Sequence, residues 1–490
     1  MNDVLPFGVI IAVVSVAGLL AVVSNRISER IRVPAPAIFL VAAAVASDFV
    51  PVLGQVPVLT VQRVVTVTLI LLLFDGGMHI GGRRFRAAGG AVLWIGVVGT
   101  GVTAVGVAVL AHLVFGFDWR AGLLLGVALA PTDPAVVFSV LGRREISGRS
   151  GTLLEGESGA NDPVGIAAMA ALLAAGTGGG WHAVGAGVGE FALEMVMGAV
   201  VGIASGYGLS VAMRRLPLPS AALYPLRTLL GSGAIYGLAT LAHGSGFLAV
   251  FVAGILVGDL RAPYKAEIER FHSSLASLAE IIAFTMLGLT VSLTGLAHGN
   301  AWLVGLALAV LLALVVRPVL VGLLLLPIKL SKGERLFVMW SGLKGAVPIL
   351  LGTYILTAGV PGADRLYQIV IVVVAFSVIV QGGLVPTVAH RTGVPMRVLE
   401  PEPWALGLRF RDEPTALHHY YITAGAPADG CTIADLALGD DTWISMINRN
   451  GTLVPVRGGT VLQAGDEVLL LADPDTTGTN PQPLFTRQHP

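Results

Sequence analysis

Charged side chains are scarce in this sequence. Only 12% of the 490 residues are Asp, Glu, Lys or Arg, whereas 55% are hydrophobic, and the mean hydropathy is +0.82. A soluble globular protein carries about 25% charged residues on average. This chain would therefore expose too much apolar surface to water, and we expect most of it to face lipid.

Basic runs and cysteines are also few. The formal net charge is zero, from 30 basic and 30 acidic residues, and no run of Lys and Arg is long enough to indicate nucleic-acid binding. The single cysteine, Cys431, excludes an internal disulfide and is typical of a reducing compartment on its side of the membrane. The first apolar stretch, Leu5 to Val23, lacks a basic start and an obvious cleavage site, so it predicts a retained transmembrane helix.

Apolar segments of membrane-spanning length are abundant. A spanning helix needs about 20 mainly apolar residues, and the 63 glycines are typical of helices that pack closely in a bilayer. We predict about thirteen spans, near residues 4–24, 33–50, 61–79, 89–115, 119–141, 152–176, 184–213, 223–242, 246–260, 271–294, 300–327, 335–359 and 366–390.

The connections between these segments alternate in charge. Every second connection carries a cluster of Lys and Arg, as in RRFR (83–86), whereas the others, such as 176–182 and 296–300, carry almost none. Under the positive-inside rule this pattern places the N-terminus outside and the C-terminus in the cytosol. The predicted protein is a multi-pass protein of the cell's inner (plasma) membrane.

The composition changes after about residue 400, beyond the predicted membrane domain at 1–396. Residues 403–475 carry more charge, short alternating apolar runs, and turn signals such as NRNG and AGD. They predict a small cytosolic domain of the α/β or mainly β class. Residues 476–490, rich in Thr, Pro and Gln, are expected to be disordered.

Asp133 lies midway along one apolar segment, in the run ALAPTDPAVVF. Pro131 and Pro134 each remove a backbone donor, and they push Ala130 and Asp133 out of the helical conformation. The helix is therefore expected to unwind at this carboxylate. Irregular backbone inside a membrane lines a cavity or is buried in protein, and a broken helix with a carboxylate at its break can form a midplane ion site.

A second carboxylate cluster reads EGESGANDP. Asp162 lies about ten residues into its segment, roughly 15 Å deep at 1.5 Å per residue, which is near the midplane. Helical spacing places Glu155 and Ser158 on the stripe of Asp162. A carboxylate, a hydroxyl and carbonyls freed by the following proline suit a hard cation. Asn161 is placed to hold Glu157 without adding a charge.

Three further ionisable residues lie inside apolar segments. Arg317 lies in VVRPVL, Lys344 in the Gly- and Pro-interrupted run SGLKGAVPILL, and Glu280 in LAEIIAFTMLG. Charges inside a membrane are costly and usually pair with one another. For these three residues structural pairing is favoured over a direct role as ligands.

These motifs resemble those of the cation/proton antiporters of the NhaP/NHE type, over about residues 5–395. The matching runs are APTDP, EGESGANDP, HGSGFLAVFVAGI, EIIAFTMLGL and GLKGAVP. The ESGANDP form and the tail look most like the bacterial potassium/proton antiporter branch. The resemblance implies an all-α polytopic fold with inverted repeats and two crossed, unwound helices, which here hold Thr132–Asp133 and Gly342–Val347.

The resemblance also implies the ligands of the site. Asp162 is the carboxylate shared by the proton and the monovalent cation, and Thr132, Asp133 and Ser158 supply further oxygens. Neither a cofactor nor an enzymatic activity is implied.

Other residues shape this site by the same resemblance. They are Asn161 and Glu157, and Glu157 is expected to pair with Lys344. Arg317 and Glu280 are counted among the site-shaping residues because they are charges inside apolar segments. The family usually has Arg at the position of Lys344, and a lysine is a point charge where arginine offers a fork of donors.

The tail resembles a TrkA-C (RCK-C) regulatory domain in the runs PADGCTIADLAL, TWISMINRNG and TVLQAGDEVLLLA. Such a domain implies a homodimer and a small effector such as a nucleotide or cyclic dinucleotide. The sequence carries no Gly-rich dinucleotide fingerprint ahead of it, and the regulatory ligand is unknown.

The sequence thus predicts an antiporter that exchanges protons for K⁺ or Na⁺ by alternating access and serves pH homeostasis. Asn161, where a second Asp would add a charge, favours electroneutral exchange. One alternative is a tail-gated cation channel, although no TVGYG-like filter occurs. Another is an intramembrane aspartyl protease, which needs two acids that share a water, but its GxGD and PAL motifs are absent.

Overall fold

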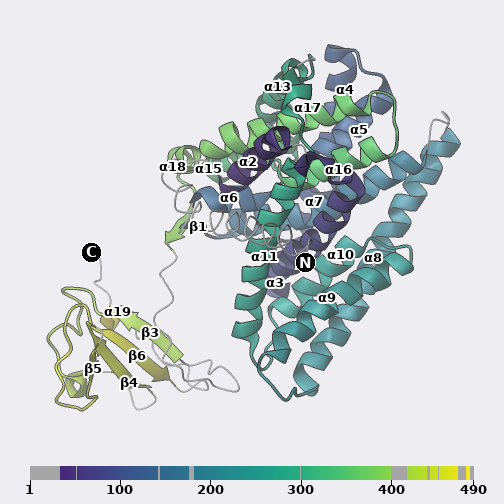
Figure 1. The fold of residues 1–490 in the computed structure, drawn as a ribbon. Coiled ribbons are helices and arrows are strands. Elements are labelled where there is room, and N and C mark those ends of the chain that lie inside the picture. The colour runs from purple at the N-terminus through teal and green to yellow at the C-terminus, as the bar shows by residue number, and fades with distance from the viewer. Residues whose placement is uncertain are drawn as a thin grey trace, which may run out of the picture. The chain divides into compact units, whose positions relative to one another are not determined.

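A computed structural model describes residues 34–50, 52–141, 144–175, 181–297, 300–398, 417–436, 438, 442–450, 452–472 and 482–485. The chain divides into two compact units, Met1–Pro403 and Trp404–Pro490 (Figure 1). The first predicted span, 4–24, lies outside the described residues.

The first unit is helical. Its opening helices are α2 (Ala35–Phe49), α3 (Val58–Leu93), the π-helical segment η2 (Trp94–Gly99) and α4 (Thr100–Phe115), with the 3-10 turn η1 (Leu53–Gln55) after α2. The predicted interruption between 61–79 and 89–115 falls at Gly81, whose φ of 65° and ψ of 164° are not helical, so two helices meet there at a kink. The RRFR stretch itself is helical, since arginine is a good helix former.

The next helices include the predicted interruption. They are α5 (Trp119–Leu129), α6 (Pro134–Leu141), α7 (Arg149–Ala174) and α8 (Trp181–Arg215), with the short strand β1 (Arg144–Ile146) between α6 and α7. The prolines divide the segment 119–141 at residues 130–133, as the sequence predicts. Pro163, by contrast, lies inside α7 without ending it.

The second half of the unit contains the same kinds of element. Its elements are α9 (Leu223–Leu241), α10 (Gly246–Gly258), α11 (Lys265–Gly288), α12 (Leu293–Ala297), α13 (Ala301–Leu311), the π-helical η3 (Leu312–Val321), α14 (Gly322–Leu324), α15 (Lys332–Trp340), α16 (Ala346–Thr357), α17 (Ala363–Phe376), the π-helical η4 (Ser377–Gln381), α18 (Val385–Thr392) and strand β2 (Met396–Val398). The predicted span 335–359 is divided at Ser341–Gly345.

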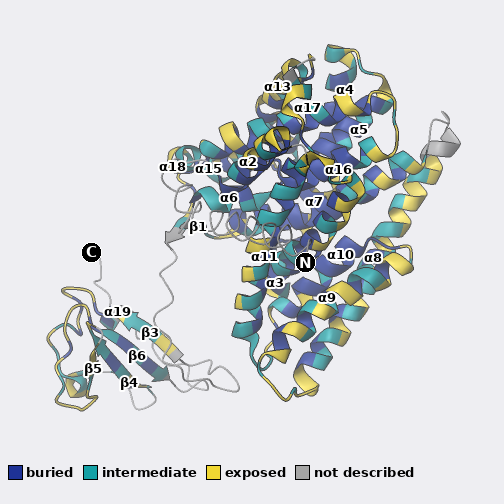
Figure 2. Cartoon of the chain, viewed as in Figure 1, coloured by how far each residue is buried: buried dark blue, intermediate teal, exposed yellow. Residues whose placement is uncertain are grey.

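The apolar surface of this unit fits a membrane environment. Six helical stretches among the described residues are long and apolar enough to cross a membrane, and the apolar helices α2, α10 and α16 are shorter. Exposed apolar side chains occur along α8, among them Val188, Val196 and Ile203, and Figure 2 shows this helix mainly in yellow and teal. The inner helix α10 packs on α3 and α8 and is largely buried.

The second unit contains a four-stranded antiparallel sheet in the order β3-β6-β4-β5. Its elements are β3 (Leu417–Tyr421), the 3-10 turn η5 (Ile433–Asp435), β4 (Thr442–Arg449), β5 (Thr452–Val454), β6 (Glu467–Ala472) and α19 (Gln482–Phe485). Of the two predicted classes, mainly β describes this part of the chain better than α/β.

Helix α19 corrects part of the prediction for the tail. Residues 476–490 were expected to be disordered, yet Gln482–Phe485 form a helix of 4 residues. Phe485 is fully buried and stacks on Tyr420 with ring centroids 5.2 Å apart. Apolar burial against the sheet outweighs the polar composition of the segment.

Candidate functional site

Two helix breaks meet inside the first unit. The break between α5 and α6 holds Thr132 and Asp133, and the break between α15 and α16 holds Leu343 and Lys344. The backbone N–H of Asp133 donates to the carbonyl of Leu343 at 2.8 Å. The two unwound segments predicted from the sequence therefore contact each other directly, in a region where Thr132 and Lys344 are buried.

The carboxylate of Asp133 lies at the start of two helices. Its Oδ1 accepts the N–H of Ala135 in α6 at 2.9 Å, and the backbone N–H groups of Val136 and of Ala346 in α16 lie near enough to act on the carboxylate electrostatically. Negative charge is favourable at a helix N-terminus. Gly345 permits this approach, because a Cβ there would lie 1.9 Å from Asp133 Oδ2. Asp133 thus joins α6 to α16.

Asn161 of α7 is bonded to the first break. Its Oδ1 accepts the N–H of Thr132 at 3.3 Å, and its Nδ2 donates to Thr132 Oγ1 at 2.8 Å. The expectation that Asn161 holds Glu157 is therefore wrong. The two hydrogen bonds instead hold the unwound backbone against the helix that carries Asp162.

Asp162 lies near the middle of α7 and is 9% exposed. Its Oδ1 is buried and makes no hydrogen bond within the described part of the chain. Asp133 and Lys344 are close enough to act on it electrostatically. Ser158, also buried, precedes it by one helical turn. A buried carboxylate oxygen without a donor is costly, and a proton or a cation would satisfy it.

Glu157 forms a buried ion pair with Arg317 of η3. Arg317 donates from one guanidinium nitrogen to both carboxylate oxygens, at 2.8 and 3.2 Å, and from Nε to the carbonyl of Met339 at 2.9 Å. Gly342 gives the guanidinium room, because a Cβ there would lie 1.8 Å from Arg317 Cζ. The predicted pairing of Glu157 with Lys344 is wrong.

Lys344 instead binds the first break. Its Nζ donates to the carbonyls of Ala130 and Pro131 at 3.0 and 3.2 Å. The reason is the prolines, which leave backbone carbonyls inside the unit without helical partners. An ammonium group supplies the donors that these carbonyls lack.

A polar cluster on the last helices anchors Lys344, and the sequence reasoning missed it. The N–H of Lys344 donates to Ser377 Oγ at 2.9 Å, and Ser377 donates to Gln381 Oε1 at 3.1 Å. Gln381 in turn donates to the carbonyl of Trp340 at 2.7 Å. A serine and a glutamine spaced by one turn in the apolar run VVVAFSVIVQGG were the available signal.

Three further acids of the first unit are Glu280, Glu155 and Asp75. Glu280 of α11 has a buried Oε1 with no hydrogen bond among the described residues, and it acts electrostatically with Asp133. Glu155 lines a separate cavity beside Arg149. Asp75 of α3 accepts a hydrogen bond from Ser273 at 3.3 Å. Glu280 therefore acts on the site, whereas none of the described residues that line the cavity of Glu155 belongs to either break.

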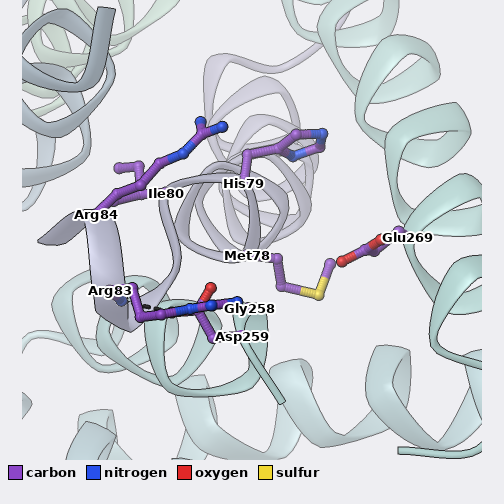
Figure 3. A pocket seen from close by; sticks show the side chains of 8 residues that line it. All are labelled: Met78, His79, Ile80, Arg83, Arg84, Gly258, Asp259 and Glu269. Carbon is purple, nitrogen blue, oxygen red and sulfur yellow. Dashed lines mark hydrogen bonds and ion pairs between the residues drawn. The ribbon is translucent and has the colours of Figure 1, made fainter. Parts of the chain in front are cut away.

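A cavity of about 530 Å³ between α3, α10 and α11 is drawn in Figure 3. Met78, His79, Ile80, Arg83, Arg84, Gly258, Asp259 and Glu269 line it. Arg83 is paired there, since its backbone N–H donates to Asp259 Oδ2 at 2.5 Å and its Nε lies 3.5 Å from the same oxygen. None of the predicted site residues lines this cavity.

The fold and the site define a membrane transporter built on broken helices. Residues 8–391 match the family model described as "Sodium/hydrogen exchanger, transmembrane", and residues 417–479 match the TrkA-C domain. The chain belongs to the sodium/hydrogen exchanger family. It is a monovalent cation/proton antiporter and not an enzyme, so the channel and protease alternatives are set aside.

Named relatives agree with this assignment. The chain is 34% identical over 388 residues to the K(+)/H(+) antiporter NhaP of Alkalimonas amylolytica, covering 78% of this chain and 66% of that one. It is 31% identical over 468 residues to the K(+)/H(+) antiporter NhaP2 of Shewanella sp. (strain ANA-3), covering 93% and 80%. The sodium proton antiporter MjNhaP1 of Methanocaldococcus jannaschii, at 22% identity, has a similar fold, with a TM-score of 0.64 over 76% of this chain and 98% of that one.

Proposed function

We propose that this chain exchanges K⁺ for protons at Asp162. The observation that carries the proposal is the buried Oδ1 of Asp162, which has no donor in the described part of the chain, on a carboxylate near enough to Asp133 of the α5–α6 break to interact with it electrostatically. The two relatives above are named K(+)/H(+) antiporters, which supports K⁺. A relative at 28% identity, from Halobacillus dabanensis, is named a Na(+)/H(+) antiporter, so both ions enter the test.

In this mechanism Asp162 holds either a proton or a cation. In the cation-bound state Thr132, Ser158 and Asp133 add oxygen ligands to the carboxylate. Movement of one helix bundle against the other then exposes the same site to the two sides of the membrane in turn. One carboxylate serves both ions, so a bound proton and a bound cation exclude each other.

Neither Glu157 nor Asn161 adds a net charge beside Asp162. Glu157 is neutralised by Arg317, and Asn161 adds no charge beside Asp162. One cation then exchanges for one proton, and the exchange is electroneutral. Glu280 shapes the field near Asp133 without binding the cation.

The arrangement in the membrane completes the proposal. The charge alternation supports thirteen spans with the N-terminus outside and the C-terminus inside. The proposal places these spans in inverted repeats in the plasma membrane. Residues 1–396 form the exchanger and 403–475 a cytosolic regulatory domain, which dimerises and binds a small effector of the nucleotide class.

The main experiment is an exchange assay in sealed proteoliposomes with a preset pH gradient. Adding K⁺, Na⁺ or Li⁺ to wild type should collapse the gradient, most strongly with K⁺. Asp162→Asn should abolish the response because an amide cannot exchange a proton. Glu190→Gln, an exposed acid on α8, is the matched control and should respond like wild type. An active Asp162→Asn variant would refute the site.

The stoichiometry is tested in the same vesicles. Electroneutral exchange moves no net charge, so a diffusion potential set with a gradient of a permeant anion such as thiocyanate, at equal K⁺ on both sides, should leave the rate of pH-driven exchange unchanged. A rate that follows the imposed voltage would contradict one-for-one exchange without affecting the assignment of Asp162.

A further inference from the structure

A positively charged side chain of the protein, Lys344, lies at the break between α5 and α6. The ammonium of Lys344 lies 3.0 Å from the carbonyl oxygen of Ala130 and 3.2 Å from that of Pro131. Free carbonyl oxygens at such a break are the groups that replace the hydration shell of a monovalent cation in selective ion sites. Here a side chain takes that position.

A hydrogen bond to the backbone of Lys344 fixes the position of its side chain. The Lys344 side chain is fully enclosed, with the residue 2% exposed, and its backbone N–H is bonded to Ser377, which is bonded to Gln381. Lys344 makes its two hydrogen bonds to carbonyls and none to the nearby carboxylates within the described residues, since Glu157 is taken by Arg317. Its charge nevertheless acts on Asp162. The tethered ammonium therefore lies next to the proposed cation site without being part of an ion pair.

We propose that Lys344 determines the ion specificity of the exchanger: its tethered ammonium occupies the carbonyls of Ala130 and Pro131, so the transported cation binds side-chain oxygens around Asp162 and cannot use these two carbonyls. The inference rests on the proposed cation site. Lys344 is a positioning residue here, because it acts by withholding ligands and by its fixed charge, without touching the ion.

The cation site at Asp162 therefore offers few oxygen ligands and lies beside the positive charge of Lys344. Larger cations such as K⁺ and Rb⁺ accept more oxygen ligands than Li⁺ does, so freeing two carbonyls should favour the larger ions. Removing the ammonium should therefore lower the KM for K⁺ and Rb⁺ more than the KM for Li⁺. We expect the ratio of the Li⁺ KM to the K⁺ KM to rise roughly fivefold, the change that one additional good ligand produces.

The test compares four variants in the proteoliposome assay, with KM measured separately for Li⁺, Na⁺, K⁺ and Rb⁺. Lys344→Met removes the ammonium and should shift the KM ratio. Lys344→Gln keeps a donor for a carbonyl, and Lys344→Arg keeps both donors and charge, so both should stay closer to wild type. Ser377→Ala removes only the backbone anchor and should lower the rate without shifting the ratio.

Cation binding is also measured without transport. The rise in melting temperature of purified protein on adding K⁺ or Li⁺ reports binding even in a variant that does not turn over. A Lys344→Met protein with the wild-type KM ratio and wild-type melting shifts would overturn the proposal. Equal changes in Lys344→Met and Ser377→Ala would also overturn it, because they would indicate general loosening of the break. If Lys344→Met does not fold, Lys344→Gln decides: it replaces two charged hydrogen bonds with one neutral donor, so it should shift the KM ratio in the same direction by a smaller amount, and a wild-type ratio for Gln would count against the proposal. Activity in Asp162→Asn would instead refute the proposed function.

Discussion

Glu157 and Arg317 neutralise each other inside the membrane unit, with side chains only 4% and 3% exposed. Three of the hydrogen bonds of Arg317 go to Glu157 and to the carbonyl of Met339, so its charge is well satisfied. The pair is 160 residues apart in the chain, and it joins α7 to η3. Its contribution is to hold the helix of Asp162 against the second half of the unit.

Replacing only one partner of this ion pair should destabilise the protein more than replacing both partners. Arg317→Met leaves the Glu157 carboxylate buried without a partner, at a cost of about 3–5 kcal/mol. The double variant Arg317→Met with Glu157→Gln leaves no charge and should recover part of the melting temperature lost in the single variant. Thermal unfolding of the purified proteins measures both, and a double variant as unstable as the sum of the singles would contradict the pairing.

At the scale of elements, the contact between the two breaks depends on the two glycines of GLKG, Gly342 and Gly345, which have no side chains. Gly342 gives space to Arg317 and Gly345 to Asp133. The prolines of the first break and the glycines of the second thus have different structural roles. The prolines prevent the helix from closing, and the glycines let charged groups approach the backbone. Both are needed for the breaks to meet.

Gly345→Ala tests this requirement. The new Cβ would fall 1.9 Å from Asp133 Oδ2, so the carboxylate must leave the start of α16. We expect loss of most exchange activity and a melting temperature lower by several degrees. Gly233→Ala on α9 is the matched control, because nothing lies within 4 Å of the added carbon. Wild-type exchange in Gly345→Ala would show that the close approach is dispensable.

At the scale of the whole molecule, the strand that leads toward the tail is bonded to the region of the site. Strand β2 pairs antiparallel with β1, and the N–H of Ser147 donates to the carbonyl of Pro395 at 2.8 Å. Strand β1 lies between α6, which follows Asp133, and α7, which carries Asp162. A pull on β2 therefore acts on the two helices that frame the site.

Two truncations separate this strand from the tail. A chain ending at Pro403 keeps β2 and all described site contacts, so it should exchange cations with the wild-type KM. A chain ending at Val394 loses β2, and without this partner for β1 we expect a lower exchange rate and a lower melting temperature. The proteoliposome assay compares the two, and equal behaviour would refute a coupling role for the β1–β2 pair.

The tail unit has its own ion pair, between the partly exposed Arg449 and the buried Asp466. Arg449 donates from Nε and one further nitrogen to both oxygens of Asp466, each at 2.7 Å. Burial favours a higher pKa for Asp466, but the hydrogen bonds from Arg449 and from the Gln463 backbone outweigh it and hold the pKa below its usual value. The carboxylate thus stabilises the folded sheet in its ionised form.

This shift predicts the acid sensitivity of the sheet. A carboxyl with a lowered folded pKa stabilises the protein above its unfolded pKa, about 3.9, and the effect is lost as pH falls through the folded value. Stability of β4 and β6 should therefore be flat from pH 7 to pH 5 and fall below about pH 4. Pulsed hydrogen exchange of these strands in urea, in the full chain, measures it. In Asp466→Asn the loss should already be present at pH 7, and an unchanged urea midpoint there would contradict the role of the pair.

Much of this protein follows from the sequence alone. Hydropathy determined that the chain is a membrane protein, because nothing else could bury so much apolar surface. Pro131 and Pro134 determined the break at Asp133, because proline lacks a backbone donor wherever it lies. The motif around Asp162 identified the family that residues 8–391 match. These are local properties that need no knowledge of neighbours.

The partners of the buried charges were decided only by the tertiary structure. Sequence spacing could not tell that Arg317 reaches Glu157, that Lys344 turns to the carbonyls of Ala130 and Pro131, or that Asn161 holds Thr132. The residues that these contacts join are between 29 and 214 positions apart in the sequence. Which donor meets which acceptor depends on how helices distant in sequence cross, and on the glycines that let them approach. That packing is a property of the whole fold, because most buried polar groups must find a partner at once, and an exception among the described residues such as Asp162 Oδ1 marks the site.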